Sequence, residues 1–126
     1  GRTVKLGDYT QKIVFINFWT SWCSACKEEL LMWAEEGEKM ASDPHVAIIS
    51  VNVGESEEKV REFMDNNGID LNVLLDTRQN VAEKYGISAF PTTFILEKGG
   101  VVYDIYTTRL SSDEVAEYIY TIKNKD

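Results

Sequence analysis

The stretch Phe15-Ile-Asn-Phe-Trp-Thr-Ser-Trp-Cys-Ser-Ala-Cys-Lys-Glu-Glu-Leu30 predicts the fold of this 126-residue chain. The apolar run Ile13–Trp19 ends shortly before Cys23 and Cys26, which are the only two cysteines. A near-continuous apolar run is typical of a strand that is buried on both faces of a parallel sheet. A helical pattern begins at Ser24, so the cysteines lie one helical turn apart, between a predicted strand and a predicted helix.

Further strands and helices are expected around this stretch. The pattern predicts a helix over residues 24 to about 41 and a buried strand over Val46–Val53. A strand, a helix and a strand in this order predict a right-handed βαβ unit with parallel strands. A short edge strand is expected earlier, over residues 3–6. The apolar stripe expected on the helix consists of Leu30, Trp33, Ala34, Gly37 and Ala41.

Residues 57–86 predict a helix–strand–helix insertion in the sheet scaffold. Ser56 is the expected N-cap of the first helix, because its hydroxyl can accept an unpaired backbone N–H. Residues 71–75 are the expected strand, and Asp76 or Thr77 is expected to cap the second helix.

The last third of the chain predicts a strand, a hairpin and a helix. Residues 89–96 form the expected strand, Gly99 and Gly100 the turn, and residues 101–107 an antiparallel edge strand. The whole chain therefore predicts a single α/β domain with a central mixed β-sheet flanked by helices. The last helix begins at Ser111 or Ser112, and its expected apolar stripe is Val115, Ala116, Ile119 and Tyr120.

Composition excludes several classes of function. The net charge of −8 repels phosphate backbones, so nucleic acid is not an expected partner. The acidic clusters at residues 35–38 and 55–58 are expected to be solvated helix faces. No run of 18 apolar residues is present, so no membrane span is expected. The start at Gly1 leaves open an upstream anchor or signal segment.

The two cysteines suit neither a structural staple nor a metal site. A bridge between Cys23 and Cys26 would close a very short loop and constrain the unfolded chain little. Structural zinc needs four ligands, and only His45 could join the pair. We therefore expect a disulfide that opens and closes, with no metal and no other cofactor.

Position assigns the expected role of each sulfur. Cys23 comes just before the helix, where unpaired backbone N–H groups and the helix dipole favour an anion. Since a thiolate attacks and a thiol does not, Cys23 is the expected nucleophile. Cys26 is expected to be more buried and to resolve the mixed disulfide. Trp22 is expected either to shield the site or to be an ordinary packed tryptophan.

These motifs carry a family resemblance that runs from about Val4 to Ile122. The segment Phe18-Trp-Thr-Ser-Trp-Cys-Ser-Ala-Cys26 resembles the active site of the thioredoxin fold. Phe90-Pro-Thr-Thr-Phe94 resembles the cis-proline loop of that fold. Two further segments, Val51-Asn-Val-Gly-Glu-Ser56 and Val73-Leu-Leu-Asp-Thr77, resemble the TlpA/ResA-like branch. A thioredoxin-like fold is what this resemblance implies.

The resemblance also implies roles for single residues. Pro91 matches the cis-proline that faces the sulfurs and leaves the backbone at Phe90 free to pair with an extended substrate. Glu29 matches an acid that would adjust thiol acidity or move a proton, and Glu55 matches an acid that would serve in substrate recognition. The residues alone also allow a trans proline at the strand entry and two solvated glutamates.

Two departures from thioredoxin proper bear on the chemistry. Asn17 stands where thioredoxin has a buried aspartate, and an amide cannot accept a proton from Cys26. Any base must therefore be Glu29 or water. The dipeptide Ser24-Ala25 between the cysteines lacks the histidine that is typical of strong oxidants, which favours a reductant.

The expected function is that of an extracytoplasmic thiol–disulfide oxidoreductase that reduces disulfides in partner proteins, for example apocytochrome c. The alternatives are a disulfide oxidase or isomerase, a reductant for another extracytoplasmic enzyme (cell-wall or spore assembly, methionine sulfoxide reductase), and a non-catalytic binding module. The resemblance implies a monomer that is re-reduced by a membrane thiol donor of the CcdA or DsbD type. It also implies a domain that is membrane-anchored, periplasmic or secreted.

Overall fold

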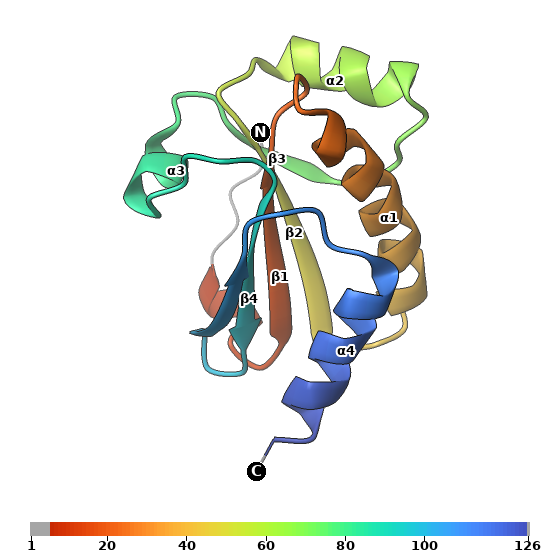
Figure 1. The fold of residues 1–126 in the computed structure, drawn as a ribbon, viewed down its shortest axis with the longest axis vertical. Coiled ribbons are helices and arrows are strands. Elements are labelled where there is room, and N and C mark those ends of the chain that lie inside the picture. Colours follow the sequence, from red (N-terminus) through yellow and green to blue (C-terminus); the bar gives the residue numbers. More distant parts are fainter. Residues whose placement is uncertain (1–5, 126) are drawn as a thin grey trace.

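A five-stranded sheet forms the centre of the computed structural model, which describes residues 6–125 (Figure 1). The strand order is β3-β2-β1-β4-β5. β1 is parallel to β2 and β2 to β3, whereas β4 is antiparallel to both β1 and β5. The mixed sheet predicted from the sequence is therefore confirmed. The strands are β1 (Ile13–Trp19), β2 (Val46–Val53), β3 (Val73–Asp76), β4 (Thr92–Glu97) and β5 (Val101–Tyr106).

Helices cover both faces of this sheet (Figure 1). α1 (Ser24–Met40) and α4 (Ser112–Lys123) pack on one face, and the short α3 (Asn80–Lys84) lies on the other. α2 (Glu57–Asn66) crosses the end of the sheet at which α1 begins. α2, β3 and α3 are thus the helix, strand and helix expected within residues 57–86.

The continuous apolar run of β1 follows from these two layers of helices. Every residue of β1 is buried. Phe15 packs with Trp33 of α1 and Val115 of α4, whereas Phe18 packs on the opposite face with Ala82 of α3. Since successive side chains of a strand point to opposite faces, both sets of positions in β1 have to be apolar.

The caps and turns are close to those predicted. Ser56 is the N-cap of α2 and accepts the backbone N–H of Lys59 at 3.2 Å. Ser111 is the N-cap of α4 and forms a capping box with Glu114. Because Glu97 pairs with Val101, the hairpin turn has three residues, Lys98, Gly99 and Gly100. Gly99 and Gly100 have φ angles of 92° and 78°, which glycine adopts without a steric cost.

Several boundaries differ from the predicted ones. The edge strand predicted over residues 3–6 lies outside the described residues except for Leu6, which begins a 3₁₀ helix (η1, Leu6–Tyr9). Neither predicted cap of α3 is correct, because its N-cap is Gln79, in a left-handed conformation. The carboxylate of Asp76 still accepts the N–H groups of Val81 and Ala82, but it does so from the end of β3.

The predicted faces of α1 and α4 were partly wrong. Ala41 and Ala116 are exposed, and Tyr120 is 71% exposed. The inward side of α1 instead includes Met32, Glu29 and Glu36. The side of α4 that meets the core has the spacing i, i+3, i+4, i+7 and consists of Val115, Tyr118, Ile119 and Ile122. No helix within residues 6–125 is long and apolar enough to cross a bilayer.

Candidate functional site

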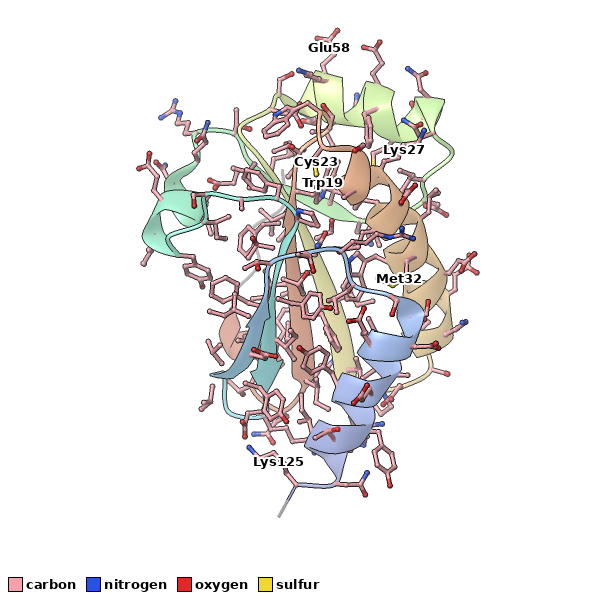
Figure 2. All side chains as sticks on the ribbon, in the orientation of Figure 1. Trp19, Cys23, Lys27, Met32, Glu58 and Lys125 are labelled. Carbon is pink, nitrogen blue, oxygen red and sulfur yellow. The ribbon has the colours of Figure 1, made fainter. Side chains whose placement is uncertain are left out.

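Cys23 lies where the chain leaves β1 and enters α1 (Figure 2), and Cys26 is in the first turn of α1. Cys23 is the N-cap of α1, with an extended backbone, and its Sγ accepts the backbone N–H of Cys26 at 3.3 Å. Both cysteines are free thiols, Cys23 partly exposed and Cys26 only 1% exposed. The expected order, an accessible first sulfur and a buried second sulfur, is therefore present.

A cis-proline loop faces the first sulfur. The peptide bond between Phe90 and Pro91 is cis, as the sequence predicted. The Cys23 thiol lies 3.4 Å from the carbonyl oxygen of Phe90 and donates to it. Pro91 is buried and Phe90 is partly exposed. The backbone just before the proline is thus next to Cys23.

Trp22 stands out from the surface beside this loop. Its side chain is 71% exposed, and its ring meets that of Phe90 edge to face, with centroids 5.9 Å apart. It is therefore not an ordinary packed tryptophan. Trp19, three residues earlier, has that role: it is fully buried, and its indole N–H donates to Ser50 Oγ at 2.9 Å.

Glu29 is fully buried one turn beyond Cys26. Its Oε1 accepts the Asn17 amide N–H and the Trp33 indole N–H, the latter at 2.9 Å. Its Oε2 accepts the backbone N–H of Leu110 at 2.7 Å. Asn17 also donates to Thr93 Oγ1 at 3.1 Å, so the one polar residue of β1 is hydrogen-bonded in the core.

Burial shifts the acidity of both Glu29 and Cys26. It raises the pKa of Glu29 above the usual 4.5, and the N–H donors of Leu110, Trp33 and Asn17 offset it only in part. Burial also raises the pKa of Cys26, and the hydrogen bond with Cys23 and the charges of Cys23 and Glu29 raise it further. Both raised pKa values mean that the protein disfavours the charged form of the group more than water does.

Glu55 is a second buried carboxylate, and it binds Ser21, two residues before Cys23. It is 6% exposed, so the predicted solvated cluster at residues 55–58 is wrong for this member, as the cluster at 35–38 is for Glu36. Its Oε1 accepts the backbone N–H of Ser21 and the Asn52 amide N–H, both at 2.8 Å. Burial acts to raise its pKa, but hydrogen bonds from Asn52, Ser21 and Lys59 outweigh burial, and the pKa lies below 4.5.

Sequence reasoning missed several residues of these two hydrogen-bond networks. Asn52, which binds Glu55, and Thr93, which binds Asn17, lay inside segments that resembled the family, but neither had been given a role. Ser21 also lay inside such a segment without a role, although both of its polar groups bind Glu55. The backbone N–H of Leu110 had no signal at all, because it is 81 residues from Glu29 in the chain.

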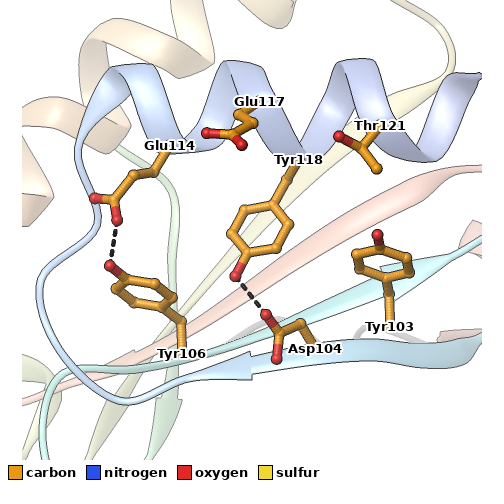
Figure 3. A pocket seen from close by; sticks show the side chains of 7 residues that line it. All are labelled: Tyr103, Asp104, Tyr106, Glu114, Glu117, Tyr118 and Thr121. Atoms are coloured by element: carbon orange, nitrogen blue, oxygen red, sulfur yellow. Dashed lines mark hydrogen bonds between the residues drawn. The ribbon is translucent and has the colours of Figure 1, made fainter.

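A pocket lies away from the cysteines, between β5 and α4 (Figure 3). Its volume is about 330 Å³. Tyr118 donates to Asp104, and Tyr106 donates to Glu114, so both hydrogen bonds join the strand to the helix. The pocket is lined by Tyr103, Asp104, Tyr106, Glu114, Glu117, Tyr118 and Thr121.

Within residues 6–125, no three His, Cys, Asp or Glu side chains are grouped as a metal site would need.

The fold and the sulfur pair together define a protein of the thioredoxin-like class. Residues 1–105 match the AhpC/TSA family. The thiol-disulfide oxidoreductase ResA of Bacillus subtilis is 37% identical over 123 residues, which cover 98% of this chain and 68% of that protein. The chain belongs to the AhpC/TSA family and is a thiol–disulfide oxidoreductase of the ResA type.

Two solved structures agree with this assignment. StoA from Bacillus subtilis has a TM-score of 0.77 and 25% identity, covering 86% of this chain and 83% of that one. The pneumococcal exposed lipoprotein thioredoxin from Streptococcus pneumoniae has a TM-score of 0.79 and 28% identity, covering 96% of this chain and 93% of that one. The thioredoxin-like fold expected from the sequence is therefore confirmed.

Proposed function

We propose that this oxidoreductase reduces disulfides in partner proteins outside the cytoplasm. The observation that carries the proposal is the setting of Cys23. Its sulfur is partly exposed, accepts an N–H at the start of α1, and lies 3.4 Å from the carbonyl oxygen that precedes the cis-proline. A nucleophilic sulfur needs this combination of access and nearby N–H donors.

The proposed reaction has two exchange steps. The Cys23 thiolate attacks one sulfur of the partner disulfide, a mixed disulfide forms, and the other partner sulfur leaves as a thiolate. Cys26 then loses its proton and attacks the Cys23 sulfur, which releases the second partner thiolate. The partner gains two electrons, and the Cys23–Cys26 disulfide holds the oxidised state without another cofactor.

Glu29 is the proposed acceptor of the Cys26 proton. It is buried at position i+3 from Cys26 on the same helix, and its charge opposes a second negative charge on that sulfur. Asn17 cannot take this role, since an amide accepts no proton at neutral pH. The raised pKa of Glu29 brings its acidity closer to that of a thiol, as proton transfer between them requires.

Trp22, Phe90 and Pro91 are the proposed contacts of the substrate. The exposed indole and the backbone before the proline border Cys23 on one side. An extended partner segment could pair with that backbone and bring its disulfide to the sulfur. Glu55 was the fourth contact expected from the sequence. Its side chain is buried, which favours a different role.

The proposed physiological setting follows the family. Apocytochrome c is the substrate that we propose first, with a membrane thiol donor of the CcdA or DsbD type to regenerate the thiols. We also propose that residues 1–126 form one domain, that residues 57–86 are an insertion in it, and that it acts as a monomer. An extracytoplasmic location is supported by the name of the pneumococcal relative, an exposed lipoprotein.

Trapping of the mixed disulfide tests the proposal. Cys26→Ser should hold a partner protein on Cys23 through a bond that dithiothreitol releases, whereas Cys23→Ser should hold none. Wild-type protein should reduce insulin, and Cys23→Ser should not. If neither wild type nor Cys23→Ser reduced insulin, the reductase proposal would fail and the binding-module alternative would be favoured. The reduction potential of the pair separates a reductant from an oxidase or isomerase.

A further inference from the structure

Glu55 binds the loop that connects β1 to α1 and contains Cys23. The backbone N–H of Ser21 donates to Glu55 Oε1 at 2.8 Å, and the Ser21 hydroxyl donates to Oε2. Both polar donors of one loop residue therefore bind one carboxylate. Such charge-assisted, two-point hydrogen bonding fixes orientation as well as distance.

Glu55 itself has little freedom to move. Asn52, at the end of β2, donates to its Oε1 at 2.8 Å, and Lys59 of α2 lies 3.3 Å from its Oε2. The Thr77 hydroxyl donates to its backbone carbonyl oxygen at 3.1 Å. Three separate segments of the fold thus hold Glu55, two through its carboxylate and one through its backbone.

The two residues after Ser21 make the contacts on which the proposed reaction depends. Trp22 packs edge to face on Phe90, and the sulfur of Cys23 lies 3.4 Å from the Phe90 carbonyl oxygen. The Cys23 sulfur also accepts the backbone N–H of Cys26, in the first turn of α1. A shift of Ser21 would move both residues relative to the proline loop and to the helix start.

We infer that Glu55 is a positioning residue for the redox site, acting through Ser21 to hold Trp22 and Cys23 against Phe90. This inference rests on the proposed function. Glu55 has too little exposed surface, 6%, to be a substrate contact of its own. Substrate recognition by Glu55, which the sequence led us to expect, would instead require direct contact with the partner.

Two disulfides of different size distinguish these roles. A displaced Cys23 is a poorer nucleophile for any disulfide, so Glu55→Gln should slow the reduction of both insulin and the small aromatic disulfide DTNB by about tenfold, roughly what the loss of one charge-assisted hydrogen bond costs. A loss with insulin alone would indicate direct substrate contact and overturn the inference. Unchanged rates with both in a folded variant would indicate a structural role only and overturn it as well.

A double-mutant cycle tests the route through Ser21. Ser21→Ala removes the hydroxyl donor and leaves the backbone N–H, so it should slow DTNB reduction by about threefold, less than Glu55→Gln does. The double variant should be no slower than Glu55→Gln, because both changes remove the same contact. Rates that multiply would show that the two residues act independently and would contradict the inference.

Matched controls separate this result from loss of charge or failure of the proposed function. Glu57→Gln removes an exposed carboxylate from the start of α2, and both rates should stay unchanged within twofold. Rates should be compared below the melting temperature of every variant. A wild-type chain that reduced neither disulfide would defeat the proposed function, whereas an active wild type with a fully active Glu55→Gln variant would defeat this inference alone.

Discussion

The two buried carboxylates near the cysteines have pKa values that are shifted in opposite directions. Glu29 is fully buried and accepts only neutral N–H donors, from Asn17, Trp33 and Leu110. Glu55 accepts a similar number of donors, but the ammonium of Lys59 is among them and a small part of its side chain reaches solvent. The pKa of Glu29 is raised and that of Glu55 is lowered.

This difference shows what decides the role of a buried acid. The hydrogen bonds to Glu29 and the charge of Arg109 do not compensate for its complete removal from water, so it can hold a proton that Cys26 has to release. Hydrogen bonds together with a cation do compensate at Glu55, which stays ionised and can accept two donors from Ser21 at once. One acid is suited to exchange a proton, and the other to hold a loop.

Truncation of Glu29 should have the largest effect on stability. Glu29→Ala leaves three buried N–H donors without a partner, which should lower the free energy of unfolding by about 4 kcal/mol. Urea unfolding measures this value. The matched control is Glu28→Ala, whose carboxylate is 61% exposed and pairs with Arg109, and which should cost less than about 1 kcal/mol. Similar losses in the two variants would contradict the buried network.

Truncation of Glu55 should cost less. Glu55→Ala removes the acceptor of Asn52 and of both Ser21 donors, but the loop lies near the surface and water can replace part of what is lost. We expect a decrease of about 2 kcal/mol in the free energy of unfolding. The control Glu57→Ala should change it by less than about 0.5 kcal/mol. A larger loss for Glu55→Ala than for Glu29→Ala would reverse the comparison.

The dependence of stability on pH should differ in sign between the two acids. The lowered pKa of Glu55 gives a contribution that is present above 4.5 and is lost as the pH falls through that pKa. The raised pKa of Glu29 means that the folded state holds this proton more tightly, so its contribution is greatest below 4.5 and is lost as the pH rises to the raised pKa.

Urea unfolding across pH, with Glu29→Gln and Glu55→Gln as references, measures both contributions. The stability difference between wild type and Glu55→Gln should shrink toward acid. The difference between wild type and Glu29→Gln should change in the opposite direction. Parallel curves for both variants would mean that the two carboxylates titrate alike, and the comparison would fail.

Removal of the exposed indole should have the smallest effect on stability. Trp22→Ala should change the free energy of unfolding by less than about 0.5 kcal/mol, because the side chain is 71% exposed. Insulin reduction should nevertheless slow severalfold, and Trp22→Phe should restore part of the rate. A strongly destabilised Trp22→Ala variant would show that the loop held by Glu55 also depends on packing by Trp22.

Much of the fold could be predicted because the relevant patterns are local. The run Ile13–Trp19 is apolar except for Asn17, since helices cover both faces of the sheet. The cap Ser111 and the turn at Gly99 and Gly100 depend on neighbours in sequence. The cysteine pair and Pro91 could be predicted because short motifs carry them. These features need no knowledge of distant contacts.

The burial of the acidic side chains could not be predicted, because it depends on partners from elsewhere in the chain. The side chain of Glu29 is buried on α1, and one of its N–H donors is the backbone of Leu110, 81 residues later. Glu55 is buried because Ser21, 34 residues earlier, turns both of its donors toward it. Periodicity that counts every glutamate as polar assigns both residues to a solvated face.

The hydrogen bonds from α3 to the Asp76 carboxylate couple the stability of that helix to β3, the strand at one edge of the sheet. α3 has only five residues, too few to persist alone in water, and two of its N–H groups bind a carboxylate on the last residue of β3. The amide hydrogens of Val81 and Ala82 are therefore shielded from exchange only while β3 stays paired with β2. We therefore expect strand and helix to open to solvent together, which hydrogen exchange at these two amides would measure.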